Sequence, residues 1–221
     1  MSEDRKKLSY NEKPDYYFSN ARIDYVNQLP DSTESRVLEI GCGAGATGEM
    51  ALNKGKCIYY AGIDIDIDAA NIAKNNLSEV IIGDVEDISF PWEEETFDVL
   101  ICSEVLEHLV DPWEVMAKLV KLLKPGGLVM ASSPNVSHYN IILNLLKGKW
   151  ELVEVGVMDK THLRWFTPTS FRCLFEDCGI TVEKLGPITK NRRKASIVNF
   201  FTFNRFSHLF MTQISIFGRK R

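Results

Sequence analysis

The chain has few of the features that mark secreted or membrane proteins. Its five cysteines show no C-x-x-C pair, which is typical of reduced thiols in a cytoplasmic protein rather than of a disulfide framework. No apolar run approaches the roughly 20 residues of a membrane-spanning helix. The first 13 residues are polar and lack the apolar core of a secretory signal. We therefore expect a cytoplasmic protein without a transmembrane segment.

The chain also lacks a strong charge of either sign and any metal-binding pattern. The net charge is −4 and the pI about 5.7, so global charge does not favour a nucleic-acid partner. The four histidines have no paired ligand spacing and no H-x-x-x-H occurs, so the sequence predicts no metal site. The 221 residues suffice for one domain with a substantial core, as a monomer or homodimer.

A glycine-rich stretch directly follows a short apolar run. Residues 37–40 have the length and composition of a buried strand, and a segment able to open a helix follows the glycines at positions 41, 43 and 45. Alternating glycines allow positive φ and remove side chains, while a helix N-terminus presents backbone N–H groups to a polar ligand. Because burying an unpaired carboxylate is costly, we expect Glu39 to meet a positive charge or a donor. The stretch predicts a cofactor-binding loop.

These glycines are compatible with two cofactor classes. Gly41, Gly43 and Ala46 satisfy the dinucleotide fingerprint G-x-G-x-x-G/A, which leaves a nicotinamide or flavin open. Read from Glu39 to Gly45 as E-x-G-x-G-x-G, the stretch resembles motif I of the class I S-adenosylmethionine-dependent methyltransferases. The segments that follow the glycines must therefore distinguish between these two cofactor classes.

Strands and helices alternate along the first part of the chain. A first helix is expected at 20–29, and strands are expected at 36–40, 56–63, 80–82, 97–102 and 128–132, the last after a turn at 125–127. The helices between them include 68–77, capped by Asp66 or Asp68, and 111–123. Short, continuously apolar strands separated by helices predict a parallel sheet covered on both faces, with the ligand crevice at the carboxyl ends of the strands.

The pattern changes after the fifth strand. An inserted helix is expected at 137–147, an irregular segment at 150–166, a helix at 167–178, and strands at 180–185 and 213–217 that suit an antiparallel edge pair. The predicted fold is α/β: a Rossmann-like seven-stranded mostly parallel sheet with an antiparallel C-terminal strand pair and helices on both faces. We expect a single domain over 1–221, with a tail and cofactor-closing helix (1–30), a cofactor-binding half (31–136) and a substrate or lid half (137–221).

Acids after the second and third strands separate the cofactor classes. Asp64 ends the second strand, where a carboxylate can bind both ribose hydroxyls in either class. The segment 83–85 (GDV) resembles the methyltransferase segment whose acid accepts a hydrogen bond from the adenine amino group. The segments 97–99 (FDV) and 123–127 (LKPGG) match later motifs of that family, and a nicotinamide fingerprint requires none of these. Over about residues 36–132 the chain resembles a class I methyltransferase of the small-molecule type, similar to ubiquinone-biosynthesis and sugar-modifying enzymes.

This resemblance implies S-adenosylmethionine as the cofactor, with S-adenosylhomocysteine as the product. It implies that Asp64 lies at the ribose, Ile65 against the adenine and Asp84 at the adenine amine. Arg22 could pair with the methionine carboxylate or lie on a solvated helix face, and Cys102 or Ser103 would line the site below the sulfonium. The whole implied cofactor set is Tyr17, Arg22, Glu39, Gly41, Cys42, Gly43, Gly45, Asp64, Ile65, Asp84, Val85, Cys102 and Ser103.

Two histidines are the candidate catalytic residues. His108 lies in a segment that looks like the E-H-L segment of small-molecule methyltransferases, and an imidazole suits deprotonation of a hydroxyl; a structural role in a helix turn stays open. His162 lies with Asp159 and Arg164 in a segment that resembles one found in methyltransferases encoded among sugar- and polysaccharide-modifying enzymes. A hydroxyl of a sugar or glycan precursor is therefore slightly favoured over a quinone-like acceptor.

Three other functions remain open at this stage. They are an N-methyltransferase of a small molecule, a nicotinamide-dependent oxidoreductase, and a non-catalytic protein that binds S-adenosylmethionine. No Asn-Pro-Pro-Tyr-type sequence follows the fourth strand, which argues against nucleic-acid bases as acceptors. We expect the aromatic segment 197–210 to cover the sheet as a core or lid element. With the basic run 190–194 nearby, the alternative is contact with a membrane surface or a lipid-linked substrate.

Overall fold

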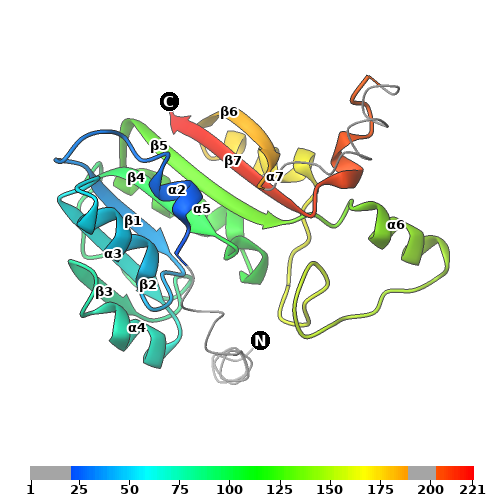
Figure 1. Cartoon of the computed structure of the whole chain (residues 1–221), viewed down its shortest axis with the longest axis horizontal. Helices are drawn as coiled ribbons and strands as arrows, with labels where there is room; N and C mark the ends of the chain where they lie inside the picture. Colours follow the sequence, from blue (N-terminus) through cyan, green and yellow to red (C-terminus); the bar gives the residue numbers. More distant parts are fainter. Residues whose placement is uncertain (1–20, 189–202) are drawn as a thin grey trace.

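Seven strands pair into one sheet in the computed structural model, which describes residues 21–188 and 203–221 (Figure 1). The strand order is β3-β2-β1-β4-β5-β7-β6. Every pairing from β3 to β5 is parallel, whereas β7 pairs antiparallel with both β5 and β6. The predicted fold class is thereby confirmed. The strands are β1 (Arg36–Ile40), β2 (Tyr59–Asp64), β3 (Glu79–Ile82), β4 (Phe97–Ser103), β5 (Leu123–Pro134), β6 (Ile180–Pro187) and β7 (Gln213–Lys220).

Helices cover both faces of this sheet because successive side chains of each strand point to opposite sides. Val37 of β1 packs in a cluster with Tyr25 and Ala51, and its neighbour Leu38 packs in another cluster with Val115 and Phe171. The first cluster thus draws on α2 and α3, the second on α5 and α7. The described helices are α2 (Ile23–Val26), α3 (Ala46–Asn53), α4 (Ile67–Ala73), α5 (Pro112–Leu122), α6 (Tyr139–Leu146) and α7 (Pro168–Asp177), with short 3₁₀ helices η2 (Leu106–His108) and η3 (Ser207–Phe210).

Three helix starts follow directly from local sequence. The carboxylate of Asp66 accepts a hydrogen bond from the backbone N–H of Ala69 at 2.8 Å, so Asp66 rather than Asp68 caps α4. Asp111 caps α5 ahead of Pro112, as expected. Thr167 opens α7 through a capping box.

Other boundaries differ from the sequence prediction. The prediction of a separate turn at 125–127 ahead of the strand is wrong. β5 already begins at Leu123, which is buried and pairs with Phe97. The register then shifts so that Val99 pairs with Leu128, and residues 124–127 are accommodated as an irregularity within the strand. The first helix is also shorter than predicted, at Ile23–Val26, because residues 27–29 close it with tight turns.

The inserted segment after β5 extends away from the sheet (Figure 1). No residue of α6 is buried, and the apolar side chains of Leu143, Leu146 and Trp150 are exposed. No helix within the described residues is long and apolar enough to cross a membrane. Tyr17 and the basic and aromatic residues from 190 to 202 lie outside the described residues.

Candidate functional site

A cavity of about 500 Å³ lies at the carboxyl ends of the parallel strands. Its lining includes most of the residues that the sequence singled out: Arg22, Glu39, Gly41, Cys42, Gly43, Asp64, Ile65, Asp84, Val85, Ser103, His108 and His162. Gly45 and Cys102 do not line it. Gly45 instead begins α3 with a φ of 82°, and Cys102 is fully buried in β4. One cavity therefore joins the predicted cofactor residues to both candidate catalytic histidines.

The glycine loop is fixed to the neighbouring strand by its backbone. The N–H groups of Gly41 and Cys42 both donate to the carbonyl of Ile63, at 2.8 and 3.2 Å. Gly41 has a φ of 71°, and a Cβ there would lie 2.4 Å from Cγ2 of Val105. Only glycine fits this position, because a side chain would both strain the backbone and collide with the wall of the cavity.

Asp64 connects the glycine loop to the turn after β2. Its Oδ2 accepts a hydrogen bond from the N–H of Gly43 at 2.6 Å, and its Oδ1 accepts one from the N–H of Asp66 at 2.9 Å. Burial raises the pKa of this carboxyl, and the backbone donors oppose that rise. A carboxylate has about four acceptor positions, so Asp64 can hold the loop and still accept from ligand hydroxyls.

Asp84 occupies the equivalent place after β3. It is 6% exposed, and its Oδ1 accepts a hydrogen bond from the N–H of Glu86 at 3.0 Å. Val85 and Ile65 lie beside it in the cavity lining and supply apolar surface. Two strand-end carboxylates with apolar neighbours thus line one cavity, and their contacts with a ribose and an adenine stay a prediction.

Arg22 projects into the cavity wall rather than lying on a solvated helix face. Its Nε and Nη2 donate to the carboxylate of Asp24 at 2.9 and 2.8 Å. Its Nη1 donates to the hydroxyls of Ser103 and Ser132. Desolvation by burial lowers the pKa of Arg22. The ion pair with Asp24, together with nearby Tyr25 and Glu104, outweighs this effect and keeps the pKa above its ordinary value. The guanidinium of Arg22 thus lines the cavity as one half of an ion pair with Asp24, and a ligand carboxylate would share its charge.

Glu39 is the buried acid of β1, and it meets the donor expected from the sequence. Its Oε2 accepts a hydrogen bond from the hydroxyl of Tyr60 at 2.8 Å. Burial nevertheless raises the pKa of Glu39 to about 8. The side chain is therefore largely protonated at neutral pH in the ligand-free protein.

Replacing Glu39 with Gln is expected to change how stability depends on pH. The folded protein keeps the proton on Glu39 up to about pH 8, whereas its ordinary pKa is 4.5. The native state binds more protons in that window, so the free energy of unfolding falls as pH rises through it. The Glu39→Gln variant has no group that titrates at this position, so its free energy of unfolding does not fall in this way. Its stability relative to wild type should rise by about 2 kcal/mol between about pH 5 and about pH 7.

Denaturant unfolding of the ligand-free proteins at several pH values measures this effect. The exposed Glu93→Gln variant is the control, with an unchanged stability difference across the series. A flat difference for Glu39→Gln as well would show that Glu39 is ionised in the folded protein.

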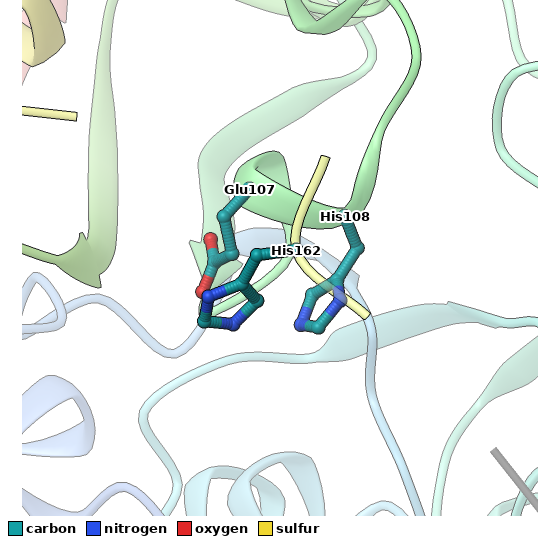
Figure 2. Close-up of side chains that lie close together, drawn as sticks. All are labelled: Glu107, His108 and His162. Carbon is teal, nitrogen blue, oxygen red and sulfur yellow. The ribbon is translucent and has the colours of Figure 1, made fainter. Parts of the chain in front are cut away.

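Glu107, His108 and His162 also line the cavity, and their side chains lie close together (Figure 2). Glu107 and His108 belong to η2, and His162 belongs to the segment between α6 and α7. The two imidazole rings meet edge to face, with centroids 4.7 Å apart. The backbone carbonyl of Glu107 accepts hydrogen bonds from the N–H groups of Leu163 and Arg164, at 2.8 and 2.9 Å. These bonds join the distant segment to η2.

The three side chains form a set that could hold a metal ion, since one ligand atom from each lies within 4.8 Å of the others. Imidazole nitrogen and carboxylate oxygen are ligands of Zn²⁺ and other first-row ions. The sequence predicted no metal site because spacing alone cannot show that His162 lies beside residues more than fifty positions earlier. Burial raises the pKa of Glu107 well above its ordinary value, and its Oε2 accepts a hydrogen bond from Ser133 at 3.1 Å.

Glu104 is a cavity residue to which the sequence analysis gave no role. Its φ is 54°, a strained value for a residue other than glycine, and strain of this kind is concentrated at functional sites. Its Oε2 accepts a hydrogen bond from Nε2 of Gln213 at 2.9 Å, and burial raises the pKa of the carboxyl. Gln213, which also lines the cavity, carried no sequence signal because it lies far along the chain from the motifs. Thr161 also lines the cavity and adjoins His162, but no role was expected for it.

Comparisons with known proteins agree with this geometry. Residues 12–185 match a family model described as a methyltransferase domain. The ubiquinone biosynthesis O-methyltransferase of Neisseria meningitidis is 34% identical over 168 residues, which cover 73% of this chain and 70% of that protein. The enzyme of the same name from Thiobacillus denitrificans is 28% identical over 187 residues, with 81% and 78% covered. The crystal structure of a SAM-dependent methyltransferase from Archaeoglobus fulgidus superposes with a TM-score of 0.64, at 22% identity, over 93% of this chain and 97% of that one.

Proposed function

We propose that this chain, which belongs to the methyltransferase domain family and is an S-adenosylmethionine-dependent methyltransferase, transfers the methyl group to a hydroxyl of a small molecule. Family membership decides against the nicotinamide alternative that the glycines left open. The observation that carries the proposal is one continuous cavity, lined from Gly41 and Asp64 to His108 and His162. Relatives named as O-methyltransferases of ubiquinone biosynthesis support both the hydroxyl and the small acceptor.

The residues at the strand ends fit the chemical groups of this cofactor. Asp64 would hold the ribose hydroxyls and Asp84 the adenine amine, while the positive charge of Arg22 would attract the methionine carboxylate. Gly41 leaves the backbone of the loop open to close approach. When bound, the cofactor supplies an electrophilic methyl group on a sulfonium that is already a good leaving group.

The part of the cavity wall formed by the two histidines can bind and deprotonate the acceptor. A neutral imidazole takes the proton of the acceptor hydroxyl, and the oxygen that loses it becomes the nucleophile for the methyl group. We assign this role to His108, with His162 beside it as a second contact for the acceptor. The rest of the rate acceleration comes from holding the acceptor oxygen in place within the cavity.

The lining favours a phenolic acceptor over a sugar. Leu109, Val155, Val157 and Ile188 contribute apolar side chains to the cavity, which suit an aromatic ring. A phenol has a pKa near 10, so an imidazole removes its proton more readily than that of an aliphatic alcohol. The acceptor class we favour is therefore a quinone-precursor-like phenol, with the hydroxyl of a sugar or glycan precursor as the alternative.

Methyl transfer from isotope-labelled S-adenosylmethionine to a panel of acceptors tests this proposal. The panel contains a 1,2-dihydroxybenzene, a nucleotide sugar and a primary amine, and mass spectrometry identifies the methylated atom. The expected product is a methyl ether of the phenol, and a methylated sugar hydroxyl would support the alternative acceptor. Methylation of the amine alone would overturn O-methylation. Cofactor binding without transfer to any acceptor would favour a non-catalytic binding protein.

A further inference from the structure

We propose that Thr161, supported by Asp159, is a positioning residue that holds the His108 imidazole with its proton on Nδ1, which makes Nε2 the ring nitrogen that can take a proton. This inference rests on the proposed function only for its catalytic consequence. The arrangement of the side chains stands without it. It assigns a role to the 156–166 segment, which the sequence analysis singled out for His162.

The atoms around Nδ1 of His108 determine which ring nitrogen carries the proton. Nδ1 lies 3.3 Å from the backbone carbonyl oxygen of Thr161 and 3.1 Å from its Oγ1. A carbonyl oxygen can only accept a hydrogen bond. Nδ1 must therefore be the donor in that contact, and the neutral ring then has its lone pair on Nε2.

The hydroxyl of Thr161 leads to the same assignment by a separate route. Oγ1 lies 2.8 Å from Oδ1 of Asp159, and a carboxylate only accepts hydrogen bonds. The single hydroxyl proton is thereby directed to Asp159, and Oγ1 presents a lone pair to Nδ1 of His108. The backbone N–H of Thr161 also donates to Oδ1 of Asp159, at 2.9 Å, so the carboxylate fixes both the backbone and the side chain of Thr161.

This chain of contacts connects a buried carboxylate to the imidazole through one hydroxyl. Asp159 is 2% exposed, and Thr161 and His108 are also buried, so little water competes with these hydrogen bonds. The two hydrogen bonds from Thr161 to Asp159 thus fix the side chain that contacts Nδ1 of His108. His162 is held in a similar way, since its Nδ1 lies 3.1 Å from the carbonyl oxygen of Val157. The same segment thus orients both rings.

Two substitutions of Thr161 separate a positioning role from a packing role. Thr161→Val keeps the shape of the side chain and removes the hydroxyl, whereas Thr161→Ser keeps the hydroxyl. We expect Thr161→Val to lower kcat by about 10-fold to 100-fold, a part of the effect of a well-placed base, with KM for S-adenosylmethionine unchanged. Thr161→Ser should stay within about twofold of wild type for both constants. Thermal stabilisation by S-adenosylhomocysteine checks that each variant is folded.

Nuclear magnetic resonance of the full-length protein with ¹⁵N-labelled histidine provides a readout that needs no acceptor. At alkaline pH with EDTA present, the ring nitrogen shifts and proton couplings report which nitrogen carries the proton. His108→Asn assigns the signals. Wild type and Thr161→Ser should show His108 as the Nδ1–H tautomer. In Thr161→Val the nearer acceptor, Oγ1 at 3.1 Å, is lost and only the backbone carbonyl at 3.3 Å remains, so the share of the Nε2–H tautomer should increase.

The outcomes separate this inference from the proposed function. Finding the Nε2–H tautomer in wild type, or finding wild-type tautomers and wild-type kcat in Thr161→Val, would overturn the positioning role. A wild-type protein with the expected tautomer that methylates no hydroxyl would contradict the proposed function and leave the positioning of His108 supported.

Discussion

Replacing Asp64 with Asn is expected to weaken binding of S-adenosylmethionine and S-adenosylhomocysteine by about 100-fold or more. Both oxygens of Asp64 accept backbone hydrogen bonds, from Gly43 and Asp66. An Asn side chain has one oxygen, so its NH₂ group must face one of these N–H donors. The substitution thus removes a charged acceptor for the ribose and also disturbs the glycine loop. Isothermal titration calorimetry with S-adenosylhomocysteine measures the loss.

Asp68→Asn is the matched control for this experiment. Asp68 lies in the first turn of α4, is exposed, and does not line the cavity. The same chemical change there should leave the dissociation constant within about twofold of wild type. Wild-type affinity in Asp64→Asn would show that the carboxylate at the end of β2 does not bind the cofactor.

Replacing His108 with Asn is expected to lower kcat by about 10²- to 10⁴-fold, the range that a positioned general base contributes. Asn keeps a polar side chain but cannot take the acceptor proton at neutral pH. Binding of S-adenosylhomocysteine should be unchanged, because the proposed cofactor contacts come from the strand-end acids and Arg22 rather than from His108. Steady-state kinetics with the acceptor that the panel identifies as a substrate measures the effect. Repeating the assay with EDTA separates it from any contribution of a metal ion.

His138→Asn is the control for the histidine experiment. His138 caps α6 by accepting a hydrogen bond from the N–H of Asn140, and Asn is also a good capping residue. Its kcat should equal that of wild type. His162→Asn tests the second ring, and combined with His108→Asn it should cost less than the sum of the two effects, because the rings are in contact. Full activity in His108→Asn would mean that the acceptor loses its proton without this residue.

Local sequence was sufficient for the features that depend on neighbours in the chain. The apolar run 37–40 predicted β1 because four consecutive buried residues fit a strand covered on both faces. Asp111 and Thr167 predicted helix starts because an N-cap acts within three residues of its own position. The acids proposed to bind the cofactor could be chosen from the sequence for the same reason, since Asp64 is the last residue of β2 and Asp84 comes two residues after β3.

Features that depend on tertiary contacts could not be predicted from the sequence in the same way. The start of β5 at Leu123 depends on its pairing with Phe97, and nothing in the LKPGG segment shows that partner. The approach of His162 to His108 depends on the bonds from Leu163 and Arg164 to the carbonyl of Glu107. Backbone hydrogen bonds of this kind leave no trace in side-chain identity. The possible metal-binding set was missed for this reason.

The position of β7 within the sheet has a consequence for the order in which the protein can assemble. β6 is synthesised before β7, yet β6 joins the sheet only through β7, which lies between β6 and β5. During synthesis on the ribosome the edge of β5 therefore stays unpaired until the last eight-residue strand emerges. An unpaired edge can pair with other chains, so a nascent or truncated form without β7 would be prone to aggregate. β7, the last of the described strands in chain order, thus lies in the interior of the sheet, whereas β6 forms its border.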